Sequence, residues 1–109
     1  MKIKIETSFN IPLATTMNTS FMNRQDAKYL SDSAPVYMIS DVFCDVIGGH
    51  VDVRKKIIHS SQDHQYKHIL MDCTFDLPDD LSERQKAEFT QKLDILFRKH
   101  QVKNKAQIV

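Results

Sequence analysis

The side chains with the greatest capacity for chemistry in this chain are its five histidines, its two cysteines and one basic cluster. His59, His64 and His68 follow one another at intervals of five and four residues, and imidazole is a common zinc ligand. Zinc sites usually take two ligands from a rigid pair, such as Cys-x-x-Cys or two histidines four apart on one helix. Here the three histidines are spread over two expected strands and the turn between them, so their side chains point in different directions. We therefore expect ordinary surface histidines and no metal site.

Cys44 and Cys73 both lie in apolar segments, where a free cysteine behaves as a small hydrophobic residue. A nucleophilic cysteine needs a histidine partner and surroundings that lower the thiol pKa. Strand alternation places Cys73 on the core side of its segment, and Cys44 falls within an expected buried helix. Two cysteines are also too few for the disulfide framework of a small secreted protein. Both are therefore expected to be structural thiols.

The charged clusters are weaker evidence for a functional site. Arg54-Lys55-Lys56 is consistent with an anion-binding site and also with a solvated strand end, and by itself the cluster favours the solvated strand end. Asp79-Asp80 precedes an expected helix, where acidic residues favour the positive end of the helix dipole. The chain contains neither a glycine-rich phosphate loop nor a paired-carboxylate motif. From the residues alone, no enzymatic function is indicated, and no cofactor is expected.

Periodicity indicates the strands that would position these residues. Residues 2–9 alternate between apolar and polar side chains, which is the pattern of a half-buried strand. Residues 51–58 and 66–75 are also expected to be strands. In the second, every other residue from Ile69 to Phe75 lies on one side, and the residues between them lie on the other. The polar stretch 60–64 between them suits an exposed turn. Residues 106–109 are expected to form a last short strand.

Residues 35–47 combine strand-like composition with a helical period. At 100° per residue their valines, isoleucines and phenylalanine share one arc, while Asp41 and Asp45 lie on the other. Gly48-Gly49 follows, and glycine commonly ends a helix. These features favour a helix, because a strand would lose the amphipathic separation.

The last helix has the clearest pattern. Ser82 and Gln85 have the spacing of a capping box, in which each side chain binds the other residue's backbone N–H. One face of this helix is formed by residues spaced i, i+4, i+7, i+8 and i+11, as in a helix lying on a sheet. These residues, called the stripe below, are Phe89, Leu93, Leu96, Phe97 and His100. A shorter helix over residues 23–31 is also expected, although its apolar face is thin.

Composition and element order together predict a single α+β domain over residues 1–109, with one sheet covered by two helices. The chain is 41% hydrophobic and 27% charged, the balance of a globular protein. Fifteen Lys and Arg against 14 Asp and Glu give a net charge of +1, so no nucleic-acid partner is expected. No apolar stretch resembles a signal peptide or a membrane span, and a cytoplasmic location is the default expectation.

The segment from His59 to His100 resembles the second half of the 5-carboxymethyl-2-hydroxymuconate isomerases, a group within the tautomerase superfamily. There a turn containing Gln, His, Asp and Tyr leads into a strand of the form H-x-x-x, and a loop leads into a helix beginning L-S/E-x-R-Q. The first strand and the hydrophobic-basic segment 51–58 are also similar, so the resemblance covers most of the chain. The matching residues are Gln62, Asp63, His64, Tyr66, His68, Met71, Leu81, Ser82, Glu83, Arg84 and Gln85.

This resemblance implies a tautomerase-like fold of two β-α-β units and a homotrimer with the site in the intersubunit region. It also implies an activity: proton transfer between carbon and oxygen, or between two carbons, of a small 2-hydroxymuconate-like or enol acid. The base in that family is an N-terminal proline, a secondary amine, and an arginine holds the substrate carboxylate through bidentate guanidinium geometry.

The chain departs from this pattern at its first residue, because it begins Met1-Lys2 and has no proline near its start. Lys2 is bulky, so Met1 is expected to be retained. A free α-amino group has a pKa of about 7.7–8.0 and can act as a base. The resemblance then implies Met1 as the proton shuttle and Arg54 as the carboxylate anchor. The alternative is a catalytically inactive trimeric binding or interaction protein on the same scaffold, and an unrelated α+β accessory protein remains open.

Overall fold

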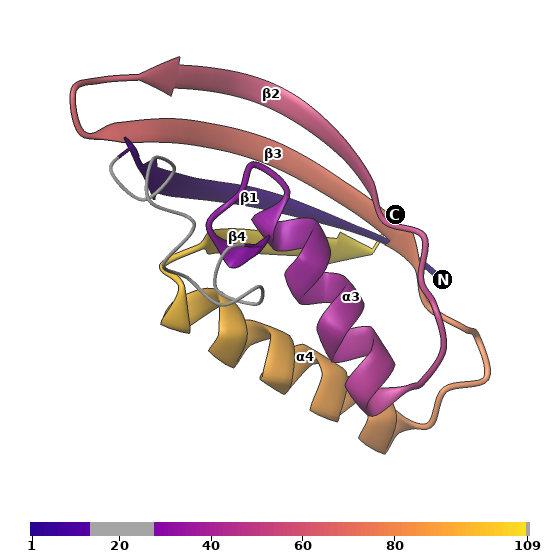
Figure 1. Ribbon diagram of the computed structural model, residues 1–109. Coiled ribbons are helices and arrows are strands. Elements are labelled where there is room, and N and C mark those ends of the chain that lie inside the picture. Colours follow the sequence, from indigo (N-terminus) through magenta and orange to yellow (C-terminus); the bar gives the residue numbers. More distant parts are fainter. Residues whose placement is uncertain (14–27, 109) are drawn as a thin grey trace.

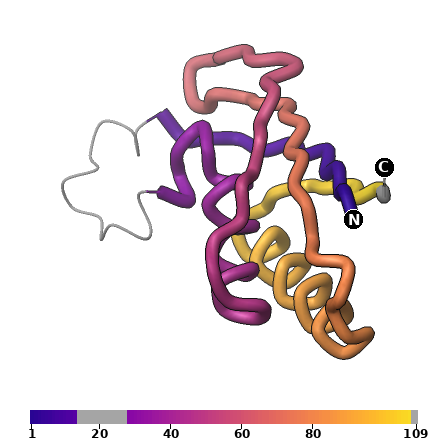
Figure 2. Tube along the Cα trace, turned by 90° about the vertical axis from the view of Figure 1, so that its right-hand side faces the viewer, coloured from indigo at the N-terminus to yellow at the C-terminus, as the bar shows by residue number. Residues whose placement is uncertain are grey.

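The computed structural model describes residues 1–13 and 28–108, which form one sheet with two helices on one of its faces (Figure 1). Both helices lie on the same side, so neither of them covers the opposite face of the sheet, called the open face below. Figure 2 shows the same layers from the side, with the hairpin of the second and third strands reaching away from the helices. In chain order the elements are β1 (Lys2–Pro12), α3 (Ala34–Val46), β2 (Arg54–Gln62), β3 (Tyr66–Asp76), α4 (Glu83–Lys99) and β4 (Lys103–Ile108).

The four strands are arranged in the order β2-β3-β1-β4, and every neighbouring pair is antiparallel. Strands β1 and β2, which flank α3 in sequence, are therefore parallel to each other with β3 between them. Strands β3 and β4 flank α4 and are separated by β1. Each strand-helix-strand unit is thus split by a strand of the other unit. The predicted α+β class, with a single sheet under two helices, is confirmed.

Alternation in the two central strands separates the core from the open face. In β1, Ile5, Phe9 and Ile11 are buried under the helices, while the even-numbered residues face the other way. Ile5 lies beside Cys73 of β3, whose side chain is completely buried. Burial raises the pKa of the Cys73 thiol to about 12, which suits an inert core thiol. The prediction for Cys73 is confirmed. β1 extends beyond the predicted range and includes Pro12 as its last residue.

The predicted helix over residues 35–47 is confirmed as α3, and its inner face contributes buried residues such as Ile39 and Phe43. Its end is fixed by Gly48 and Gly49, whose φ angles are +92° and +83°. The expectation for Cys44 was wrong, because this thiol is exposed. Cys44 follows the buried Phe43, and one step of about 100° around the helix carries it away from the sheet.

The boundaries of β2 differ from the prediction of residues 51–58. The strand runs from Arg54 to Gln62 and includes most of the stretch predicted as a turn. Pairing with β3 continues to the contact of Gln62 with Lys67, so the turn contains only residues 63–65. The register shifts between Ile57 and His59, which marks a bulge. All nine residues of β2 are exposed, because neither α3 nor α4 covers a face of this strand.

The capping box at the start of α4 is confirmed. The Ser82 hydroxyl accepts the Gln85 backbone N–H at 3.1 Å, and the Gln85 side chain accepts the Ser82 N–H at 3.2 Å. Strand β4 begins at Lys103, three residues earlier than expected. The short helix expected over residues 23–31 lies mostly outside the described residues. Within the described part of the chain, no helix is long and apolar enough to cross a membrane.

Candidate active-site groove

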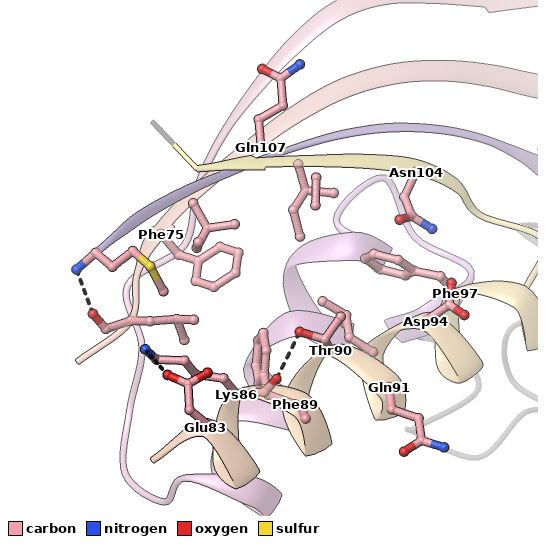
Figure 3. Close-up of a pocket in the computed structure, with 17 residues that line it drawn as sticks. Phe75, Glu83, Lys86, Phe89, Thr90, Gln91, Asp94, Phe97, Asn104 and Gln107 are labelled. Atoms are coloured by element: carbon pink, nitrogen blue, oxygen red, sulfur yellow. Dashed lines mark hydrogen bonds and ion pairs between the residues drawn. The ribbon is translucent and has the colours of Figure 1, made fainter. Parts of the chain in front are cut away.

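An apolar groove of about 740 Å³ lies between α4 and the β1–β4 side of the sheet (Figure 3). Phe75 of β3 and Phe89 and Phe97 of α4 point into it, and the rings of Phe75 and Phe89 are 5.9 Å apart. The groove exists because the β4 residues on this side, Asn104 and Ala106, are too short to fill the space above α4. The groove therefore offers an aromatic and aliphatic surface that is open to solvent along one side.

The N-terminal amine lies at one end of this groove. The Met1 α-ammonium donates hydrogen bonds to the Leu77 carbonyl oxygen at 2.9 Å and to the Asp79 carboxylate at 2.7 Å. The Leu77 N–H in turn donates to the Met1 carbonyl oxygen at 2.8 Å. These contacts attach the first residue of the chain to the loop that follows β3. They place a positive charge at the edge of an apolar surface.

Asp79 has a different role from the one expected. Helix α4 begins only at Glu83, and the Asp79 carboxylate pairs with the Met1 ammonium instead of with the start of the helix. The hydrogen bond and charge of that ammonium lower the pKa of Asp79 below its usual value. A ligand carboxylate that binds the Met1 amine would therefore have to displace the Asp79 carboxylate.

Polar side chains of α4 form the lower rim of the groove. Lys86 approaches Glu83 at 3.4 Å, and the Thr90 hydroxyl donates to the Lys86 carbonyl oxygen at 2.9 Å. Asp94 forms an ion pair with Arg98 at 3.1 Å. The rim carries both positive and negative side chains, so it does not favour a ligand of one charge. The Met1 ammonium would therefore be the main group that selects the charge of a ligand.

The structure does not bring Met1 and Arg54 together within the chain. Arg54 begins β2, where its register partner is Thr74 of β3, on the face of the sheet that points away from the helices. Arg54 is exposed and is not among the residues that line the groove. The groove thus contains one of the two predicted site residues.

The three closely spaced histidines have separate surroundings. His59 and His64 are exposed, whereas His68 lies between two oxygen acceptors. His68 Nε2 is 2.7 Å from Asp63 Oδ2, and its Nδ1 is 2.6 Å from Asn10 Oδ1. The His68 hydrogen bond, followed by those from two backbone N–H groups of the turn, lowers the pKa of Asp63 to about 2. His68 therefore links the β2–β3 turn to β1.

The residues available for metal binding are dispersed. Among residues 1–13 and 28–108, no group of three or more His, Cys, Asp or Glu side chains is placed to hold a metal ion. The groove itself offers carboxylates only at separate positions along α4. The groove was not predicted from the sequence, because its phenylalanines had the pattern of ordinary core residues. The sequence feature that could have indicated the groove is the pair of short residues, Asn104 and Ala106, that face α4 from β4.

Comparison with known proteins adds little. No family model matches the chain, and no curated protein matches it. Among solved structures, the de novo designed protein Foldit4 is similar over 100% of this chain and 99% of its own, with a TM-score of 0.43 and 5% identity. The de novo designed protein Ferredog-Diesel is similar over 99% of this chain and 85% of its own, with a TM-score of 0.39 and 9% identity.

Proposed function

We propose that this protein binds a small organic acid, of the enol or 2-hydroxymuconate-like class, in the groove between α4 and the β1–β4 side of the sheet. The observation that carries this proposal is the position of the Met1 amine at the end of the apolar groove. The apolar body of the acid would contact Phe75 and Phe89, and its carboxylate would replace the Asp79 carboxylate at the ammonium. A charged group with an attached apolar body fits a site of this kind.

In the catalytic form of the proposal, the protein is a tautomerase-like isomerase, as its resemblance implies. Once the Met1 amine has lost its proton, it accepts the proton of the enol oxygen, and the resulting ammonium returns a proton to the substrate carbon. The product is the keto acid, and the amine is regenerated. Arg54 lies on the far face of its own sheet, so it would have to anchor the carboxylate from a neighbouring subunit of a homotrimer.

The non-catalytic form has an observation in its favour. The Met1 ammonium already donates to two oxygen atoms, those of the Leu77 carbonyl and the Asp79 carboxylate. An amine held in this way is suited to attract a carboxylate. Binding without turnover is therefore the second candidate, and it uses the same groove.

The two forms are separated by following enol-to-keto conversion of phenylenolpyruvate and 2-hydroxymuconate by absorbance, using protein with an untagged N-terminus. If Met1 is the base, Asp79→Asn should raise turnover and acetylation of the α-amine should abolish it. Asp80→Asn, which removes the same charge one residue away, is the matched control. Binding detected by chemical-shift changes at Met1 and Phe75, with no turnover above buffer, would establish the non-catalytic form.

Absence of both binding and turnover would reject the proposal. Light scattering tests the assembly separately, since a homotrimer has three times the 12.7 kDa mass of the chain. A monomeric mass would remove the route by which Arg54 reaches the groove. In that case only the non-catalytic form could stand.

A further inference from the structure

Among the strands of residues 1–13 and 28–108, β4 forms an edge of the sheet. It lies at one end of the strand order and pairs with β1 alone. Residues 103–107 are all exposed. In an edge strand, alternate residues direct their backbone N–H and C=O groups away from the sheet, where another extended chain can pair with them. Six residues in regular register with β1, from Lys103 to Ile108, provide such a template.

The groove lies directly beside this edge. Asn104 and Ala106 are on the side of β4 that faces α4, and both line the groove (Figure 3). A strand added next to β4 would direct every second side chain to this same side, because side chains alternate across a sheet. Those side chains would lie beside Asn104 and Ala106, on the side of the sheet that carries the groove. The groove therefore provides an apolar surface on the side where alternate side chains of an added strand would lie.

The other side of β4 carries positive charge, which would favour acidic residues in an added strand. Lys103 and Lys105 lie on the open face of the sheet, and both are exposed. Lys105 already has the acidic Glu6 as its register partner on β1. A second acidic residue on the outer side would complete a cross-strand row of opposite charges, and such pairs favour strand association. A basic residue there would be repelled.

From these features, we propose that β4 binds an extended peptide segment of another protein, about six residues long, in which acidic and apolar residues alternate. The segment adds a fifth strand to the sheet, with its acidic side chains beside Lys103 and Lys105 and its apolar side chains in the groove. This recognition goes beyond the proposed acid binding. It uses the Asn104–Ala106 end of the groove and does not need the Met1 amine.

The test is fluorescence anisotropy with a labelled hexapeptide of alternating Glu and Val. We expect saturable binding, at least tenfold weaker binding of the matched Lys-Val peptide, and loss of at least tenfold in affinity for Ala106→Trp. The tryptophan would occupy the groove, and the protein should still fold because position 106 is exposed. Ser61→Trp is the matched control, as it places the same side chain at an exposed position of the other edge strand, and it should bind normally.

Hydrogen exchange identifies the strand that is used, since bound peptide should protect amides of β4 and leave those of β2 unchanged. Equal affinity of Ala106→Trp and the unmodified protein would overturn the proposal, as would protection confined to β2. The protein could also self-associate in the absence of peptide. If Ala106→Trp abolished that self-association, the occupant of β4 would be a second copy of the chain, and the proposal would also be overturned. Acetylation of the α-amine should leave peptide affinity unchanged, so failure of the acid-binding proposal and failure of this one are distinguishable.

Discussion

The two edge strands of the sheet have similar exposure but different surroundings. Strand β2 has nine exposed residues, is covered by neither α3 nor α4, and has a bulge between Ile57 and His59. Strand β4 is shorter, keeps a regular register with β1 and has the groove along its inner side. Arg54, Lys55 and Lys56 add charge to β2, and both charge and bulges protect edges against pairing. The two edges therefore differ in the regularity of their backbone pairing, in their charge and in whether an apolar surface adjoins them.

The largest expected difference between the groove beside β4 and strand β2 is in the packing energy of their side chains. Phe97 is 1% exposed and forms part of the groove wall, so Phe97→Ala should lower the free energy of unfolding by about 3–5 kcal/mol. Ile57 on β2 is 46% exposed, and Ile57→Ala should cost less than about 1 kcal/mol. Urea unfolding of both variants measures this difference. Equal losses would mean that β2 is covered in solution.

A smaller effect is expected at the start of α4, which forms the lower wall of the groove. Ser82→Ala removes the hydroxyl that accepts the Gln85 N–H, and the free energy of unfolding should fall by about 1 kcal/mol. Ser61→Ala on β2 is the control, because its side chain is exposed and its loss should change stability by no more than about 0.5 kcal/mol. If the serine variants were indistinguishable in thermal unfolding, the capping box would not stabilise the groove wall.

The protection of β2 can be removed by taking away its charge. The double variant Lys55→Thr/Lys56→Thr leaves Ile57 and Ile58 without basic neighbours on the N-terminal side, and we expect self-association that increases with protein concentration. Light scattering measures it. Lys103→Thr on β4 is a control for loss of charge at the other edge. A double variant with an unchanged mass at high concentration would show that these two lysines do not protect β2, and would leave the bulge and Arg54 as its protection.

The smallest effect concerns the turn that joins β2 to β3. The pKa of Asp63 is lowered from 3.8 to about 2, chiefly by the hydrogen bond from His68. Because the folded-state pKa is depressed, the stabilisation is present above about pH 4 and is lost as the pH falls through about 2. His68→Asn should return the Asp63 midpoint toward 3.8, as followed by NMR titration. A midpoint that did not move would show that the two backbone N–H donors of the turn are sufficient.

The helices were predictable because local signals and packing agree there. Ser82 and Gln85 have the capping spacing, and the stripe containing Phe89 matches the helical period, so α4 could be located from sequence. The two glycines after α3 likewise mark its end. In each case neighbouring residues in the chain contain the information, and the tertiary structure adds only the partner surface.

Strand boundaries and surface contacts were harder to predict. Ser60 and Ser61 are polar and resemble a turn, yet pairing with β3 includes them in β2. Cys44 lies in an apolar run, but its angular position on α3 exposes it. The partner of Asp79 is the first residue of the chain, and nothing in the spacing of residues 1 and 79 indicates that contact.

The sequence by itself determined the α+β class, the two helices and the buried alternation of β1 and β3, because these depend on periodicity and capping within short segments. Only the tertiary structure decided that Met1 lies at the end of a groove, that Arg54 lies on the opposite face, and that β4 is an open edge. The order of strands in the sheet fixes these relations. That order depends on long-range pairing, whose register and neighbours no local pattern specifies.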